Sequence, residues 1–292
     1  MRPFLHIHGP GRAATSLAVI LERRGWRVVS LSGGSASGAA AARAALAKDL
    51  PWAAFPKNLP HDVVLLLGVP DDRLSPAAEE VAEHAPISPG CLAVHLSGGK
   101  GLDVLAPLRV RGARVGAMHP LRSFPSRSPG DADLSGALVA IETEDAEDQR
   151  LLERMAADAG GRGFRLRAEG RALYHLGAAV MSNSLVALAD LAERTFRGAG
   201  VPPELALPGL LELARGTLAN VERLGVREAL TGPVARGDVG MLEAHLIALQ
   251  EKLPADAALY LELVRAQATI ASRRPDGEKA GAVLDWLSRP EP

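Results

Sequence analysis

The sequence has little of what disulfide-bonded, nucleic-acid-binding or membrane-spanning proteins require. Its single cysteine, Cys91, excludes a disulfide framework and a cysteine-based structural zinc site. Aromatic residues make up 3% of the chain and the formal net charge is −1, so the stacking platforms and basic surplus of a nucleic-acid binder are missing. No continuous apolar run approaches the roughly 20 residues of a membrane span. His6 also interrupts the apolar stretch that a secretory signal would need. We therefore expect a cytoplasmic protein without nucleic-acid or membrane partners.

Several catalytic patterns are missing too. The chain has neither the G-x-S-x-G turn of serine hydrolases nor the Gly-rich loop of P-loop enzymes. His6 and His8 form an H-x-H pair, but no second pair of ligands is clustered with it, so we expect no metal. What is present is a chain of 292 residues that is 47% hydrophobic. This composition supports a buried core and excludes intrinsic disorder.

The first half of the chain alternates short apolar runs with helical stretches. This βαβα order predicts a parallel sheet with helices on both faces. The expected helices are Arg12–Arg24, Ser37–Lys48, Leu74–His84 and Asp145–Ala159. The expected strands are Pro3–His8, Arg27–Leu31, Asp62–Gly68, Cys91–Leu96, Arg114–Met118, Ala137–Ile141 and Gly163–Leu166.

The second half shows only helical periodicity. A long helix is expected at Arg171–Arg197, followed by Pro203–Arg223, Val239–Leu253, Ala255–Ala271 and Ala280–Leu287. We therefore predict two domains: a Rossmann-type nucleotide-binding domain over residues 1–167 and an all-helical substrate and dimerisation domain over residues 168–292.

The strongest local motif is Gly9-x-Gly11-x-x-Ala14, which directly follows a strand and opens a helix. Such a loop presents backbone N–H groups and the positive end of a helix dipole to a pyrophosphate. We therefore predict that Gly9, Pro10, Gly11, Arg12 and Ala13 bind a dinucleotide. The alternative is a tight strand–helix turn without a ligand.

The end of the second expected strand favours NADP over NAD. An NAD-binding unit usually has an acidic residue there, but no Asp or Glu occurs between Glu22 and Asp49. Ser30 and Ser32 are expected to donate hydrogen bonds to the 2′-phosphate, and Arg12 or Arg43 to supply positive charge. Arg43 fits a solvated helix face equally well.

Polar residues at other strand ends are candidates for the chemistry. Val69 and Pro70 are expected to line the cofactor site, and Asp71 and Asp72 to cap the next helix. His119 is the expected proton donor or acceptor, and Ser97 is expected to orient it or bind substrate. Arg122 is a candidate carboxylate clamp. Ordinary turn chemistry is the alternative for all three.

The helical half adds further polar groups. Tyr174, His175, Ser182 and Asn183 lie on the long helix; His175 and Ser182, two turns apart, share one of its faces. We assign catalytic roles to His175 and Asn183 and a substrate contact to Ser182, while Tyr174 and His175 alternatively cap a domain interface. Thr231 and Arg236 lie in a polar loop that is expected to contact substrate or a partner subunit; Asp238 there is a plausible helix cap.

Six segments together resemble a bacterial family with a Rossmann-like domain and a C-terminal domain of unknown function, within the 6-phosphogluconate-dehydrogenase-like group of NADP oxidoreductases. They are His8–Arg12, Gly68–Asp72, His95–Gly98, His119–Phe124, Tyr174–Asn183 and Leu230–Asp238. The layout is also similar to prephenate dehydrogenase, pyrroline-5-carboxylate reductase and ketopantoate reductase. The resemblance to prephenate dehydrogenase places Ser97 and His119 where a catalytic serine and histidine would be. It places Asn183 where that enzyme has a histidine. The lysine that ketopantoate and β-hydroxyacid enzymes carry on the long helix is absent here.

The resemblance implies a homodimer through the helical domain and an active site between the domains. The expected activity is NADP-dependent hydride transfer to or from a small carboxylate-bearing molecule with a C=O or C=N bond. The competing hypothesis is a catalytically silent NADP-binding sensor or interaction protein, since a fold does not guarantee chemistry. A third is a transferase or lyase that uses the same loop.

Overall fold

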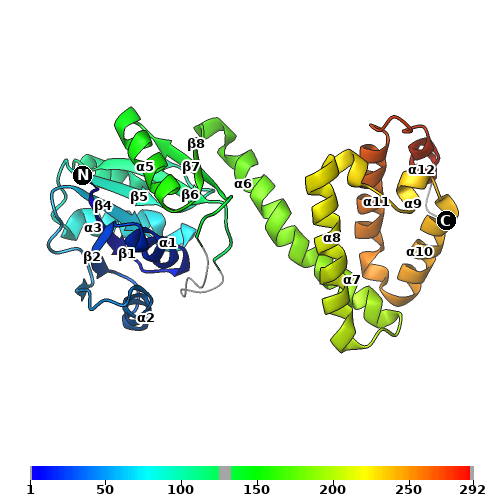
Figure 1. Ribbon diagram of the computed structural model, residues 1–292, viewed down its shortest axis with the longest axis horizontal. Helices are drawn as coiled ribbons and strands as arrows, with labels where there is room; N and C mark the ends of the chain where they lie inside the picture. The colour runs from blue at the N-terminus through cyan, green and yellow to red at the C-terminus, as the bar shows by residue number, and fades with distance from the viewer. Residues whose placement is uncertain (1, 125–132, 290–292) are drawn as a thin grey trace. The chain divides into compact units, whose positions relative to one another are not determined.

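The computed structural model describes residues 2–124 and 133–289, and the chain divides into two compact units, residues 1–179 and 180–292 (Figure 1). All described strands belong to the first unit, and the second is helical. The division falls inside the long helix, beyond residue 167 where the sequence pattern changes from strands to helices.

The first unit is built on one sheet with the strand order β3-β2-β1-β4-β5-β6-β7-β8. Its neighbours are parallel except for β6 and β7, which are antiparallel. The sheet is thus mostly parallel, as expected, and the antiparallel neighbour β7 needs no crossover helix. The seven predicted strands are present, and the two-residue strand β3 is additional. The strands are β1 (Phe4–His8), β2 (Arg27–Ser32), β3 (Trp52–Ala53), β4 (Val63–Leu67), β5 (Cys91–His95), β6 (Arg114–Pro120), β7 (Leu138–Thr143) and β8 (Arg162–Arg165).

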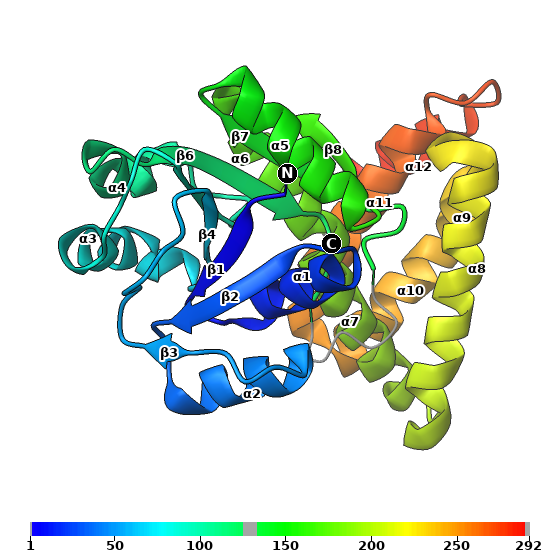
Figure 2. The ribbon, with the colours of Figure 1, turned by 60° about the vertical axis from the view of Figure 1, so that its left-hand side comes forward.

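Helices cover both faces of this sheet (Figures 1 and 2). Because alternate residues of a strand point to opposite faces, Val64 and Leu66 of β4 pack in one core cluster with α1 and α5. Val63 and Leu65 pack in another cluster with α3. This arrangement confirms the expected Rossmann-type fold. The helices of this part are α1 (Arg12–Arg23), α2 (Ala36–Leu46), α3 (Leu74–His84), α4 (Ala106–Val110) and α5 (Ala146–Asp158).

The strand order places a crevice at the carboxyl ends of β1 and β4. From β1 the chain continues to β2 and β3 on one side, and then returns to β4 on the other side. Open α/β sheets bind ligands at such a reversal of strand order. The glycine motif lies at this edge because it directly follows β1.

The long helix is not uniform. It consists of α6 (Arg171–Ala179), a π-helical segment (Val180–Ser184) and α7 (Leu185–Gly198). The other helices are α8 (Pro203–Ala229), α9 (Pro233–Arg236), α10 (Val239–Lys252), α11 (Ala257–Ala271) and α12 (Lys279–Leu287). The apolar core of the second unit packs α10, α11 and α12 around Val234 of α9.

One helical stretch, Ala168–Gly198, is long and apolar enough to cross a membrane by length and composition. The 18-residue window that meets this test has a mean hydropathy of 1.4 and none of it is buried. Continuous apolar runs do not reveal this stretch, since polar residues such as His175 and Asn183 interrupt the runs but leave the average hydropathy high. Such a helix is weak evidence for a membrane, because a helix that packs against protein passes the same test.

Candidate functional site

A cavity of about 650 Å³ lies at the carboxyl ends of β1 and β4. Most of the residues predicted to bind the cofactor line it: Gly9, Pro10, Gly11, Arg12, Ala13, Val69 and Pro70. The lining also includes Gly34, Ser35 and Gly38 from the start of α2, Gly68 after β4, and Phe124. The cavity therefore brings the glycine loop together with the segments that follow β2 and β4.

Close backbone packing explains the glycines of the loop. Gly9 has a φ of +71°, which L side chains rarely adopt. A Cβ on Gly11 would lie 2.5 Å from the carbonyl oxygen of Gly68, so this position keeps α1 close to the end of β4. Ala14 is held equally close, since a Cβ on Gly68 would lie 2.3 Å from its side chain. The glycines thus serve sheet–helix packing as well as access to a ligand.

The first turn of α1 is suited to an anion. Gly11 is its N-cap and supplies no side-chain hydrogen bond, and the first turn contains no acidic residue. The N–H groups at a helix start and the helix dipole both favour a negatively charged ligand. A phosphate group is the expected occupant of this end of the cavity.

Ser30 and Ser32 do not line this cavity. Ser32 is 0% exposed, and its hydroxyl lies 2.7 Å from His6 Nε2 and 2.9 Å from His8 Nδ1. The Ser30 hydroxyl lies 2.6 Å from His6 Nδ1. Both hydroxyls thus bind buried histidines of β1, so the structure corrects their expected contact with a 2′-phosphate. Of the two arginines proposed for this phosphate, Arg12 lines the cavity, whereas Arg43 donates to the Leu50 carbonyl at 2.7 Å.

His6 and His8 have a structural role. Burial lowers the pKa of His6 to about 3, with a smaller effect from His8, and burial lowers the pKa of His8 to about 4. Both imidazoles are therefore neutral at pH 7 and satisfied by serine hydroxyls. The residues that the structure describes include no group of three or more His, Cys, Asp or Glu placed to hold a metal ion.

A second polar cluster surrounds His119 in β6. Its Nδ1 lies 2.9 Å from the hydroxyl of Tyr174 in α6, and the two rings meet edge to face with centroids 5.6 Å apart. The imidazole packs against Gly98, where a Cβ would lie 2.7 to 2.9 Å from three ring atoms. Burial lowers the pKa of His119, the nearby His175 lowers it further and Asp71 opposes the change. The ring is therefore neutral at pH 7.

Ser97 organises the loop after β5. Its hydroxyl donates to Asp71 Oδ2 at 2.7 Å and accepts the N–H groups of Gly99 at 3.2 Å and Lys100 at 3.0 Å. The Ser97 hydroxyl thus ties this loop to the segment after β4. Asp71 is not a helix cap, as the sequence suggested, because a 3-10 turn, Asp71–Arg73, precedes α3 and moves its N-cap to Arg73.

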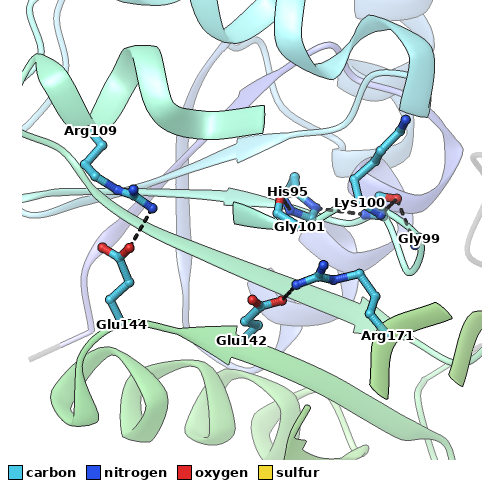
Figure 3. Close-up of polar contacts among 9 residues, drawn as sticks. His95, Gly99, Lys100, Gly101, Arg109, Glu142, Glu144 and Arg171 are labelled. Atoms are coloured by element: carbon cyan, nitrogen blue, oxygen red, sulfur yellow. Dashed lines mark hydrogen bonds and ion pairs between the residues drawn. The ribbon is translucent and has the colours of Figure 1, made fainter. Parts of the chain in front are cut away.

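Buried polar groups also hold the loop after β5 in place. His95 accepts the Ser97 N–H at Nδ1 (3.2 Å), and its Nε2 lies 3.1 Å from the Gly101 carbonyl, to which it donates. Figure 3 shows this contact, with Arg171 beside it facing Glu142. Arg171 and Glu142 form an ion pair in which both side chains are largely buried. A small recess lies among these groups, lined by Ser97, Gly98, Lys100, Ala117, His119, Ala140, Glu142, Leu166 and Arg171.

The remaining predicted residues lie elsewhere. Arg122 is exposed in the turn after β6, and His175 is exposed on α6 near Gly99. Ser182, Asn183, Thr231 and Arg236 belong to the second unit, where all four are exposed. Ser182 and Asn183 lie in the π-helical segment, a type of helix irregularity frequent at functional sites.

The sequence pattern indicates no catalytic part for Asp71 or Tyr174. For Asp71 the pattern Pro-Asp-Asp before a helix is typical of a helix cap. The helical pattern places Tyr174 on the long helix, but nothing in the sequence indicates that it meets a strand residue 55 positions earlier. The one sequence feature that points to this contact is the position of His119 at the end of a strand. A side chain there faces any helix that crosses the same edge of the sheet.

Two family models match the chain: a Rossmann-like domain over residues 3–120 and a domain of unknown function, DUF2520, over residues 137–267. No curated protein matches the sequence. Among solved structures, BF3122 of Bacteroides fragilis, provisionally named an NADP oxidoreductase, is 23% identical with a TM-score of 0.74, over 93% of this chain and 99% of that one. TM1727 of Thermotoga maritima is 24% identical with a TM-score of 0.70, over 92% and 100%.

A reductive aminase from Aspergillus terreus, in complex with NADPH and ethyl levulinate, is 19% identical with a TM-score of 0.59, over 98% of this chain and 100% of that one. These likenesses extend over both units and show that the fold is shared. Together the two family matches extend over most of the chain, with a Rossmann-like domain at residues 3–120 and a DUF2520 domain at residues 137–267.

Proposed function

We propose that the protein is an NADP-dependent oxidoreductase. The observation that carries this proposal is the cavity at the switch point of the sheet, bounded by the glycine loop and the uncapped start of α1. Its volume of about 650 Å³ suits part of a dinucleotide. A bound nicotinamide cofactor would supply or accept the hydride. The complex of the Aspergillus terreus reductive aminase with NADPH supports this choice of cofactor.

The preference for NADP over NAD rests on the segment after β2. No acidic residue lies there to repel a 2′-phosphate, and Arg12 and Ser35 both line the cavity. Ser35 is the N-cap of α2, so backbone N–H groups at the start of this helix face the same region. We assign the 2′-phosphate to Arg12 and the α2 N-terminus, in place of Ser30 and Ser32.

The substrate is a small carboxylate-bearing molecule with a C=O or C=N bond. His119 donates a hydrogen bond or a proton at the substrate oxygen or nitrogen, while Ser97 holds the adjacent loop through Asp71. His175 and Asn183 orient the substrate as polar partners. Arg122, Ser182, Thr231 and Arg236 are proposed substrate contacts, with an arginine meeting the carboxylate.

We also propose that the protein is a cytoplasmic homodimer that associates through its helical part. The helices α7 and α8 pack against each other, and both leave apolar side chains exposed. These exposed side chains support the proposal. They include Val186, which is 71% exposed, and Leu213, which is 66% exposed. Exposed apolar side chains that gather on neighbouring helices are typical of a surface that binds another protein.

Cofactor binding and turnover are tested separately. We expect NADPH to raise the melting temperature more than NADH does at equal concentration, because ligand binding to the native state stabilises it. We further expect oxidation of NADPH, followed at its absorbance band, with some member of a panel of 2-oxo acids, 2-oxo acids with amines, and cyclic imines. Stabilisation without turnover would favour the silent sensor. If neither nucleotide stabilises the protein, the oxidoreductase proposal is wrong.

A further inference from the structure

Both tyrosines of this chain hydrogen-bond the Nδ1 atom of a histidine. Tyr174 meets His119 at 2.9 Å in the first unit, and Tyr260 meets His245 at 3.1 Å in the second. Only the first pair includes a residue that the proposed reaction uses. The second pair has the same chemistry in the other unit and therefore offers an internal comparison.

The direction of the Tyr174–His119 hydrogen bond follows from the chemistry of the two groups. A phenol O–H is a stronger donor than an imidazole N–H, and an unprotonated imidazole nitrogen is a stronger acceptor than a phenol oxygen. His119 is neutral at pH 7 because burial lowers its pKa, and burial raises the pKa of Tyr174 to about 12, so the phenol keeps its proton. Tyr174 therefore donates to Nδ1, which leaves the imidazole proton on Nε2.

The surroundings of the two rings hold this arrangement in place. Phe164 of β8 contacts the Tyr174 ring with centroids 5.9 Å apart, and Gly98 packs against the His119 imidazole. Within residues 2–124 and 133–289, no side chain or backbone group hydrogen-bonds Nε2 of His119. His119 also lines the small recess beside Ser97 and Gly98. Its Nε2–H is thus the donor that remains for a ligand.

We propose that Tyr174 is a positioning residue, whose hydroxyl fixes the tautomer and orientation of His119 so that Nε2–H is presented to the substrate oxygen or nitrogen. This inference rests on the proposed function, because it assumes that His119 serves the reduced bond. Neutral imidazole in this role acts as a hydrogen-bond donor toward developing negative charge. Without the hydroxyl, both tautomers of His119 become available and the fraction with a proton on Nε2 falls.

The test is ¹⁵N NMR of the full chain labelled at histidine, with the His119 signals identified by their loss in His119→Gln. We expect wild-type His119 to carry its proton on Nε2 and Tyr174→Phe to show a mixture of tautomers. Because the lost hydrogen bond favoured the neutral ring, we expect the pKa of His119 to rise by about 0.5 to 1 in that variant. Tyr260→Phe is the matched control. It should change the tautomer mixture of His245 and leave the tautomer and the pKa of His119 unaltered.

Turnover provides the second readout, using whichever compound of the panel supports NADPH oxidation. Tyr174→Phe is expected to lower kcat about 10- to 100-fold while the KM for NADPH stays unchanged, because the cofactor cavity is untouched. The inference is overturned if wild-type His119 carries its proton on Nδ1, or if Tyr174→Phe alters neither its tautomer nor its pKa. Failure of the wild-type protein to bind NADPH would instead contradict the proposed function, which the NMR readout does not depend on.

Discussion

Gly11 packs so closely against Gly68 that a side chain at position 11 must displace backbone. In Gly11→Ala the new Cβ would lie 2.5 Å from the Gly68 carbonyl oxygen, which has no flexible side chain to move aside. We expect a loss of about 1 to 3 kcal/mol in the free energy of unfolding, the usual range for overpacking. Because the start of α1 shifts, the Kd for NADPH, measured by fluorescence titration, should rise more than tenfold.

A glycine elsewhere supplies the control. Gly216 lies inside α8 and a Cβ there would meet no atom within 4 Å. Gly216→Ala should therefore raise the free energy of unfolding by up to about 1 kcal/mol, the difference in helix propensity, and leave the Kd for NADPH unchanged. Equal effects of the two alanines on NADPH binding would show that close packing at Gly11 is not what matters.

Arg12 tests the assignment of the 2′-phosphate. It lines the cavity at the first position of α1, where its guanidinium adds to the positive end of the helix dipole. Arg12→Ala should weaken NADPH binding about 10- to 100-fold and NADH binding less than threefold, as measured by competitive titration. A parallel loss for both nucleotides would place Arg12 at the shared pyrophosphate and contradict the assignment.

For single residues, the sequence predicts where a residue lies better than it predicts which group that residue hydrogen-bonds. The loop residues Gly9 to Ala13 line the cavity because a glycine motif after a strand fixes its own local geometry. The sequence predicts a phosphate contact for Ser30 and Ser32, but their hydroxyls bind His6 and His8 on a neighbouring strand, and that pairing depends on sheet register. A bulge between Leu5 and His6 sets this register, and no local pattern indicates it.

Among the elements, β1 and β5 carry histidines whose burial makes stability depend on pH. The pKa of His6 is lowered to about 3, and those of His8 and His95 to about 4, in each case mainly by burial. In the unfolded chain the same groups titrate near 6.5. Below that pH the unfolded state binds protons that the native state does not, so stability is fully present above about 6.5 and falls toward pH 4.

Urea denaturation at pH 8.0, 6.5 and 5.5 measures this dependence. Each histidine is expected to lower the free energy of unfolding by as much as about 1.4 kcal/mol per pH unit below 6.5. In the His95→Gln variant the free energy of unfolding should fall less steeply as the pH is lowered, by the slope that about one proton contributes. This holds even if the variant is less stable at every pH. A free energy that is constant from pH 8.0 to 5.5 would show that the histidines are protonated in the native state.

Element boundaries followed from the sequence with small errors, because apolar period and capping residues act locally. α3 begins and ends as expected at Leu74 and His84. The reversed direction of β7 was missed, since period-2 patterning is identical in parallel and antiparallel strands. The π-helical segment at Val180–Ser184 was missed as well, because a helical pattern does not show which hydrogen bonds its backbone makes.

For the whole molecule, the unexplained feature is its exposed apolar surface. The most apolar window of the long helix is not buried, and leucines are exposed along α8 as well. A membrane would leave Ser182 and Asn183 in hydrocarbon, where polar groups need partners. A second copy of the chain would cover the apolar residues and would also offer hydrogen-bond partners to Ser182 and Asn183. This favours the homodimer proposed above.

Charge substitutions on this surface test the homodimer. Val186→Glu and Leu213→Glu each place a carboxylate among residues that a partner would bury. We expect wild type to sediment as a dimer without detergent and each variant to dissociate, with the dimer Kd raised about 100-fold or more. The control is Val110→Glu in α4, where the side chain is 86% exposed in the first unit and should leave the dimer intact. A wild-type protein that sediments as a monomer would contradict the homodimer. If it instead requires detergent to stay in solution, the apolar helix contacts lipid.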